Sequence, residues 1–271
     1  MKVASDFCLP ACARLPLRFS TQGLEAAVAA LPASAWVTHF NTAYHTGGWS
    51  GISLLAPEDS NHALSAGQGS GTQPPCATRW YGPPWQELLR RIEMPVRCAR
   101  LLRLEAGSSI REHCDPDLGD PDGDVRLHLP ILSGPGVEFL LEGQVVPMAP
   151  GECWFLDLAR PHRVENVGEQ ARVHLVVDAR RNDWLRRQIT GGLQDTPACR
   201  PACSTLAFAE FRRQLERRAD LAAALRDLQD PRDFCERAVA LGAGLGLRFQ
   251  DDDVRAAMRQ GRQAWLDQRS Y

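Results

Sequence analysis

The sequence predicts two parts, a mainly β domain and a smaller all-helical domain. Short apolar runs broken by turn residues follow one another from 96 to 178, a texture typical of a β-sandwich or barrel. From Leu206 onward the apolar residues recur at helical spacing instead. A stretch rich in Gly, Pro and Ser separates the two patterns. We therefore expect the β domain over 1–190, a linker over 191–204 and the helical domain over 205–271.

The strands of the β domain are expected at five apolar runs. They are RCARLLRLEAG, VRLHLPILSG, VEFLLEGQVVPMAPG, ECWFLDLARP and ARVHLVVDA. Upstream, LEAAVAAL and WQELLRRI are predicted helices, and WVTHFNTAYHTGGWSGISLL is predicted as strand, Gly-rich turn and strand. The segment 57–84 is rich in Pro, Gly and Ser, which predicts a long surface loop able to cover a pocket.

The helical domain shows both periodicity and a start signal. Leucine and phenylalanine recur at helical spacing through 206–228. Asp230-Pro231 combines a capping side chain with proline in the first turn, which predicts the start of a further helix. Asp251 is expected to open the last helix, which carries Val254 and Met258.

Bulk composition excludes several classes of function. The 271 residues carry a formal net charge of -2, with 44% hydrophobic and 24% charged residues, so we expect no binding to nucleic acid or to an anionic membrane. No apolar run reaches the ~18 residues of a spanning helix, and the first residues show no signal-peptide pattern, so we expect a cytoplasmic protein. The nine cysteines show no CxxC zinc spacing, and most are expected to be buried thiols.

Two histidines and an aspartate in the β region suit a single metal ion. His113 and Asp115 are two positions apart, so on an extended strand both side chains project from the same face. His162 follows 49 positions after His113, in the turn after ECWFLDL. Two His and one carboxylate on one face of a metal leave the opposite face open, as in non-haem iron(II) oxygenases. This ligand set favours iron(II) over zinc.

Arginines near this site predict a ligand with two carboxylates. Arg172 comes ten residues after His162 on the strand ARVHLVVD, where no carboxylate is an obvious partner. A guanidinium that points into a barrel needs such a partner. Arg126 and His128 share one strand face and could hold the other end of the same ligand. One metal with two cationic anchors suits 2-oxoglutarate.

Each of these residues also has a structural alternative. Arg126 could pair with Asp122 or Asp124 instead of a ligand. His128 could be a packed core histidine. His174 shares the face of Arg172 and could support the residues of the site, but packing is its expected role.

Several segments taken together resemble the aspartyl/asparaginyl β-hydroxylase family, whose bacterial relatives include proline hydroxylases. They are THFNTAYHTGGWSGISLL, HCD, VRLHLPI, GECWFLDLARPHRVEN and ARVHLVVD, which cover roughly residues 35–180. The resemblance implies a double-stranded β-helix, that is, a cupin-like jelly roll with flanking helices. It also implies a hydroxylase that uses iron(II), 2-oxoglutarate and O2.

The resemblance further implies a role for each matching residue in the strand region. His113, Asp115 and His162 would bind iron, Arg172 would pair with the remote carboxylate of 2-oxoglutarate, and Arg126 and His128 would lie near its metal-chelating end. The presence of Asp115 follows the bacterial pattern and disfavours halogenation.

The upstream signature carries the expected substrate contacts. They are Asn41, Tyr44 and Trp49, and the alternative for Trp49 is that it plugs the end of the barrel.

The helical tail has a resemblance of its own. FAEFRRQLERRADLAAALRDLQDPRDFCERAVALGAGLGLRFQDDDVRAAM resembles the Nif-type leader-peptide domain. Such leaders end in a double glycine before a modifiable core peptide. The tail ends QGRQAWLDQRSY, so we do not expect a precursor. The open alternatives are a packing or homodimerisation appendage and a docking module that recruits a peptide substrate.

We therefore expect a dioxygenase that hydroxylates an amino-acid side chain, in a peptide or in a free amino acid. Two rivals stay open, a non-catalytic cupin-like regulatory protein that binds metal and ligand, and a cupin-fold isomerase. Arg172 distinguishes them, because neither rival needs an inward arginine ten residues after its last metal ligand.

Overall fold

The computed structural model describes the chain except for residues 1–8, 59, 61, 68–73, 121–122 and 268–271, and except for the side chains of 260 and 262–267. The chain divides into two compact units, Met1–Cys199 and Arg200–Tyr271. This division falls inside the predicted linker. None of the described helices is both long and apolar enough to cross a membrane.

The first unit contains strands, α-helices and short 3-10 helices. Its strands are β1 (Cys12–Arg18), β2 (Val37–Thr38), β3 (His45–Thr46), β4 (Trp49–Ala56), β5 (Cys76–Ala77), β6 (Val96–Leu104), β7 (Ser108–His113), β8 (Asp124–Leu132), β9 (Val137–Leu141), β10 (Gln144–Val145), β11 (Glu152–Leu156), β12 (His162–Asn166) and β13 (Arg172–Arg180). Its helices are α1 (Thr21–Ala29), α2 (Pro83–Leu89), α3 (Asp183–Gly192), η1 (Ala33–Ala35), η2 (Thr42–Tyr44), η3 (Pro116–Leu118) and η4 (Leu193–Asp195).

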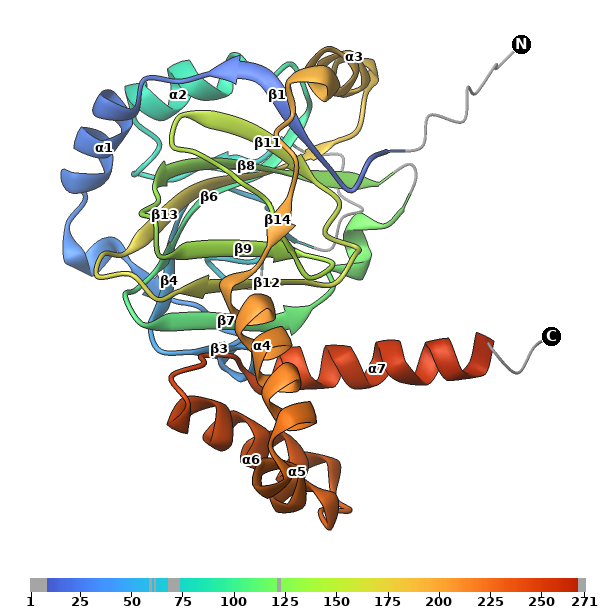
Figure 1. Cartoon of the computed structure of the whole chain (residues 1–271). Helices are drawn as coiled ribbons and strands as arrows, with labels where there is room; N and C mark the ends of the chain where they lie inside the picture. Colours follow the sequence, from blue (N-terminus) through green and yellow to red (C-terminus); the bar gives the residue numbers. More distant parts are fainter. Residues whose placement is uncertain (1–8, 59, 61, 68–73, 121–122, 268–271) are drawn as a thin grey trace. The chain divides into compact units, whose positions relative to one another are not determined.

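The strands of this unit form two antiparallel sheets (Figure 1). The larger sheet runs in the order β1-β11-β8-β13-β6-β4-β2, with β5 beside β4, and the smaller contains β10-β9-β12-β7-β3. From β6 to β13 the chain alternates between the two sheets, except at the β9–β10 hairpin. This is the topology of a double-stranded β-helix or jelly roll, so the predicted fold class is confirmed.

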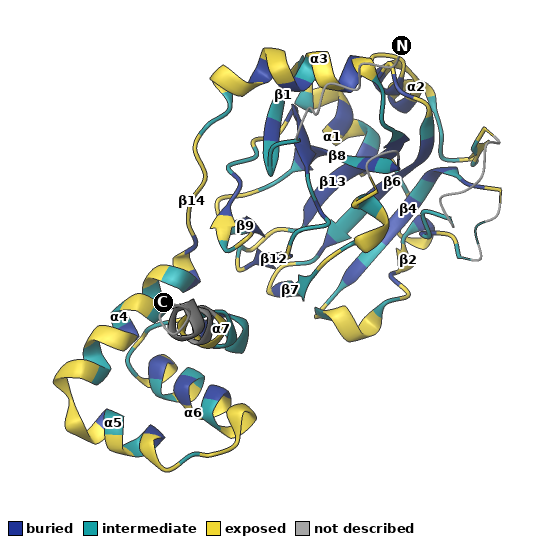
Figure 2. Ribbon diagram, turned by 90° about the vertical axis from the view of Figure 1, so that its right-hand side faces the viewer, coloured by how far each residue is buried: buried dark blue, intermediate teal, exposed yellow. Residues whose placement is uncertain are grey.

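Side-chain alternation gives the larger sheet two different faces. On β8, Leu127, Leu129 and Ile131 are buried in a core cluster that also contains apolar residues of α1, α2 and α3. Since successive side chains on a strand point to opposite faces, Arg126 and His128 lie on the other face, between the sheets. Figure 2 shows the buried strands of the larger sheet beneath α1, α2 and α3, which also carry exposed residues. The fold therefore turns a set of polar side chains inward.

One strand of the smaller sheet was not expected from the apolar runs. β12, with the sequence HRVEN, contains a single apolar residue, yet all five of its residues are buried. His162 was predicted to lie in a turn, whereas in the structure it is the first residue of this strand. A buried strand made mainly of polar residues, whose side chains form hydrogen bonds and ion pairs, shows no hydrophobic alternation in the sequence.

The second unit is a helical bundle preceded by the short strand β14 (Arg200–Pro201). Its helices are α4 (Cys203–Arg217), α5 (Ala219–Arg226), α6 (Pro231–Gly244) and α7 (Asp251–Asp267). Phe211, Leu225 and Phe249 belong to its core. The predicted start of a helix at Asp230-Pro231 is confirmed, because the Asp230 side chain accepts hydrogen bonds from the first N–H groups of α6.

Candidate metal centre and active-site pocket

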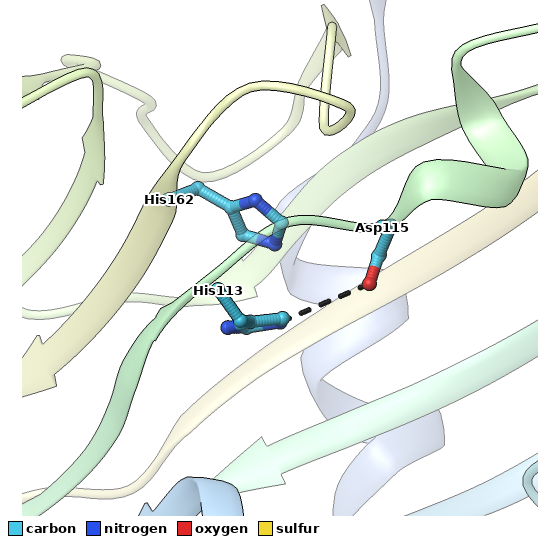
Figure 3. Close-up of side chains that lie close together, drawn as sticks. All are labelled: His113, Asp115 and His162. Atoms are coloured by element: carbon cyan, nitrogen blue, oxygen red, sulfur yellow. Dashed lines mark ion pairs between the residues drawn. The ribbon is translucent and has the colours of Figure 1, made fainter.

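Three side chains with metal-binding atoms converge at one end of the smaller sheet (Figure 3). His113 is the last residue of β7 and His162 the first of β12, and they are direct partners across the two strands. Their ring centroids lie 4.2 Å apart. Asp115 follows β7 at the start of η3, where its backbone N–H donates to the carbonyl of Leu158 at 2.8 Å. The ligand atoms of the three residues all lie within 4.8 Å of one another.

An irregularity in β7 turns His113 toward this centre. Val164 of β12 pairs with Ile110, whereas His162, two residues earlier, pairs with His113, three residues later. β7 therefore holds one extra residue between the two pairs, which is a β-bulge. In a regular strand Ile110 and His113 would face opposite sides, but here both line the same cavity. The bulge was not visible in the sequence pattern.

Hydrogen bonds leave one nitrogen of each histidine available for a metal ion. Nδ1 of His113 donates to the carbonyl of Arg111 at 2.8 Å, and Nδ1 of His162 donates to the carbonyl of Arg160 at 3.0 Å. A carbonyl only accepts, so the proton sits on Nδ1 and the lone pair on Nε2. Burial lowers the pKa of His162 to about 4, which keeps its ring neutral near pH 7. Neutral imidazoles and a carboxylate are the forms that ligate metal, so this set fits a divalent ion.

These three residues border a cavity of about 260 Å³. All nine residues singled out in the sequence line it: Asn41, Tyr44, Trp49, His113, Asp115, Arg126, His128, His162 and Arg172. Other lining residues come from 64–67, which belong to the loop predicted to cover a pocket. The fold thus brings Asn41 and Arg172, which lie 131 positions apart in the sequence, to one cavity.

Arg172 is a buried cation without a carboxylate among the described residues. Its side chain is 2% exposed, and its only hydrogen bond there runs from Nη2 to Nδ1 of His174 at 2.8 Å. Its Nε is buried and has no hydrogen-bond partner in the described part of the chain. Burial lowers the pKa of Arg172 to about 9, so the guanidinium is still charged at neutral pH. A buried charge of this kind calls for an anion.

Arg126, in contrast, already has two carboxylates. Its Nε and Nη2 donate to the two oxygens of Asp178 at 2.6 and 3.0 Å, and its Nη1 donates to Asp115. Asp124, one of its expected alternative partners, pairs instead with Arg97 and Arg180, and the other, Asp122, lies outside the described residues.

Asp178 is the part of this network that sequence reasoning missed. It is 2% exposed and also accepts from Nη2 of Arg100 at 2.5 Å and from the thiol of Cys98 at 3.3 Å. Burial alone would raise the pKa of Asp178, but Arg126 and Arg100 together hold it well below the usual aspartate range. Arg100 continues the network to the carbonyl of Leu64 at 2.8 Å. A metal-ligand candidate is thereby connected to the loop at the cavity.

His128 and His174 form a neutral pair beside Arg172. Their Nδ1 atoms lie 3.5 Å apart, and Nε2 of each is buried with no partner among the described residues. Burial, with a further contribution from Arg172, lowers the pKa of both rings well below the ordinary value. His174, for which packing was expected, is the residue that holds Arg172 in place.

The upstream residues form the outer wall of the cavity. Tyr44, 41% exposed, packs edge-on against His113 with ring centroids 5.3 Å apart. Trp49 is buried and stacks on His39 at 3.5 Å. Asn41 precedes η2, and its N–H donates to Nδ1 of His39 at 3.3 Å. His39, for which packing or surface exposure was expected, also lines the cavity and contacts both Asn41 and Trp49.

Fold and site together define a jelly-roll protein with a candidate His-Asp-His metal centre. The sequence model of the family described as Aspartyl/Asparaginyl beta-hydroxylase matches residues 33–182, more than half of the chain. The chain belongs to this family, as its motifs predicted.

Individual relatives match over shorter or weaker regions. L-proline cis-4-hydroxylase of Rhizobium meliloti (strain 1021) is 32% identical over 83 residues, which cover 31% of this chain and 29% of that protein. An oxidoreductase of the 2OG-Fe(II) oxygenase family from Burkholderia pseudomallei is 19% identical, with a TM-score of 0.45, 64% of this chain and 86% of that chain being covered. A Pseudomonas putida prolyl-4-hydroxylase is 14% identical, with a TM-score of 0.43 and coverage of 64% and 93%.

Proposed function

We propose that this protein is an iron(II)- and 2-oxoglutarate-dependent dioxygenase that hydroxylates an amino-acid side chain. One observation carries the proposal: a single cavity holds two histidines and a carboxylate whose ligand atoms converge, and also a buried arginine that has no carboxylate partner among the described residues. A metal ion suits the first set and an anion suits the second. Family membership and the likeness to a proline hydroxylase support the same reading.

The metal would be held by His113, Asp115 and His162, with coordination positions left open on the opposite side. Bound iron(II) would supply oxygen activation coupled to the oxidation of 2-oxoglutarate to succinate and carbon dioxide. The protein's own contribution is positional. Arg126 donates to Asp115 and so orients that carboxylate, as neighbours of metal ligands commonly do.

Arg172 would bind the remote carboxylate of 2-oxoglutarate. Its guanidinium offers a planar fork, and His174 holds that fork through one Nη atom. His128 lines the same cavity, and its Nε2 has no partner among the described residues, so this nitrogen would contact the other end of the cosubstrate. Because Arg126 already holds two carboxylates, its contact with the cosubstrate stays a prediction.

The substrate is proposed to be an amino acid, free or within a peptide. A cavity of about 260 Å³ is small beside the usual range for ligand sites, which favours one short side chain next to the cosubstrate. Asn41, Tyr44 and Trp49 would contact it from the outer wall. The second unit is proposed to recruit a peptide partner, with a homodimerisation role as the alternative.

An anaerobic titration tests the cofactor assignment. Iron(II) and then 2-oxoglutarate are added to the metal-free protein, and the weak visible metal-to-ligand charge-transfer band is recorded. We expect the band in the wild type, and its loss in Asp115→Ala and Arg172→Ala. Arg187→Ala is the matched control, because this arginine is exposed on α3 and distant from the cavity lining. Iron binding without a band on addition of 2-oxoglutarate would refute the role of Arg172.

Turnover is tested separately by following succinate. We expect slow conversion of 2-oxoglutarate to succinate without substrate, and its loss in His162→Ala. Neither a regulatory binding protein nor an isomerase produces succinate, so an unchanged 2-oxoglutarate concentration together with a normal band would favour these rivals.

A further inference from the structure

Two cysteines that the proposed function does not use lie in contact at the end of the first unit. Cys12 is the first residue of β1, and Cys199 is the last residue of the unit, 187 positions later in the chain. Their Sγ atoms are 3.7 Å apart. Cys199 is exposed and Cys12 is half-buried, so small oxidants can reach the pair.

The segment before Cys199 is held along β1 by few contacts. β1 begins the order of the larger sheet, so one of its sides is an edge. The N–H of Arg14 donates to Oγ1 of Thr196 at 3.0 Å, and the Arg14 guanidinium donates to the carbonyl of Asp195. Residues 196–199 have no regular secondary structure. This segment therefore covers the edge of β1 through polar contacts, without pairing to it as a β-strand.

We propose that Cys12 and Cys199 are a disulfide-forming pair that locks this segment to β1 under oxidising conditions. A disulfide requires a separation of about 2.05 Å between the sulfurs, so the two atoms must approach by about 1.7 Å. Because residues 196–199 are irregular and at least partly exposed, side-chain rotation and a small backbone shift supply this movement. The inference is independent of the proposed catalytic function.

The chemistry is a two-step oxidation by a peroxide. The Cys199 thiolate attacks one peroxide oxygen, the O–O bond breaks, and a sulfenic acid forms while hydroxide leaves and is protonated to water. The Cys12 sulfur then attacks the sulfenic sulfur, the S–O bond breaks, and a second water leaves with the Cys12 proton. Two thiols and one hydrogen peroxide thus give one disulfide and two waters. Burial and then Cys199 raise the pKa of Cys12 to about 12, which makes Cys199 the first nucleophile.

Two of the other described cysteines are buried and chemically shielded. Cys98 is buried and donates to Asp178, and burial raises its pKa to about 12. Cys153 is buried in the core, where burial also raises its pKa to about 12. The exposed Cys76 and Cys203 provide comparison sites for the test.

Peptide mapping of the full-length chain tests the pair. The protein is treated with hydrogen peroxide, alkylated and digested without reductant, and the linked peptides are identified by mass. We expect a Cys12–Cys199 crosslink in the wild type, in Cys76→Ser and in Cys203→Ser, and none in Cys199→Ser. Cys199 is exposed, so its serine variant is expected to fold.

Thermal unfolding gives a second readout. A crosslink across so long a loop is expected to raise Tm by roughly 5 °C or more, and dithiothreitol is expected to reverse the shift. The same peroxide treatment should leave Tm of Cys199→Ser unchanged. The proposal is overturned if Cys199 is found linked to Cys203, if it is oxidised to a sulfinic acid while Cys12 still alkylates, or if both thiols alkylate after peroxide.

Discussion

Replacement of Asp178 by asparagine removes the charge of this side chain while nearly keeping its shape. The side chain is 2% exposed and accepts hydrogen bonds from Arg126, Arg100 and Cys98. Asparagine has nearly the same volume, but it is neutral and turns an NH2 donor toward groups that are donors themselves. Asp178→Asn therefore leaves the buried guanidinium of Arg100 and the half-buried guanidinium of Arg126 without their shared carboxylate.

The expected cost follows from the loss of one partner in a buried ion pair. Such a loss destabilises a protein by about 3–5 kcal/mol, because a buried charge is left uncompensated. For a unit of this size, this corresponds to a fall in Tm of roughly 6–20 °C. We also expect iron(II) to bind about 10-fold more weakly or worse, because Arg126 loses the partner that orients it beside Asp115.

Chemical denaturation, with the m-value checked for each variant, measures the loss of stability. Metal titration measures the loss of iron(II) affinity. Asp124→Asn is the matched control, since Asp124 also pairs with two arginines in the larger sheet but does not contact Asp115. Burial raises the pKa of Asp124 despite Arg180 and Arg97, so its charge adds little stability and a change within about 1 kcal/mol is expected. A loss in Asp178→Asn no larger than in Asp124→Asn would refute the reasoning.

Three further perturbations have defined outcomes. The pKa values of His128 and His174 are held well below 6.5, so as pH drops the unfolded chain takes up protons that the folded chain does not. The free energy of unfolding is therefore expected to fall by about 1.4 kcal/mol per pH unit for each histidine below pH 6.5. A free energy of unfolding that stays constant from pH 7.5 to 5 in urea denaturation would contradict this. Arg172→Lys keeps a charge but loses the planar fork, so 2-oxoglutarate is expected to bind about 10-fold more weakly or worse while iron(II) affinity is unchanged, as measured by the charge-transfer band. Gly242→Ala places a methyl group 2.3 Å from a ring carbon of Phe249, so it is expected to destabilise the second unit alone by about 1–3 kcal/mol. Calorimetry of the separate unfolding transitions measures this effect, and an equal loss of stability in both units would count against it.

Alternation along strands made much of the site predictable. Arg126 and His128 were expected on one face of a strand, and Arg172 was expected to point inward, and the structure places all three at the cavity. These inferences succeed because β8 and β13 have one face covered by apolar residues, so their alternation is visible in the sequence. The family motifs predicted which histidines and which aspartate meet.

Features that depend on pairing between distant strands were not predictable. The bulge in β7 adds one residue, and no residue type in REH marks it. Asp178 lies in the strand ARVHLVVD, but its partner Arg126 is 52 positions away on a neighbouring strand. Its role depends on the register of β8 against β13, which local sequence does not specify.

The pairing of His113 with His162 has a consequence for how the sheet forms. A slip of one residue between β7 and β12 would preserve most backbone hydrogen bonds but would turn one of the two rings to the opposite face. A metal ion that needs both rings would bind only the correctly aligned sheet and would stabilise that alignment in proportion to its concentration. The ion would then act during folding as a selector among competing strand alignments, before any reaction takes place.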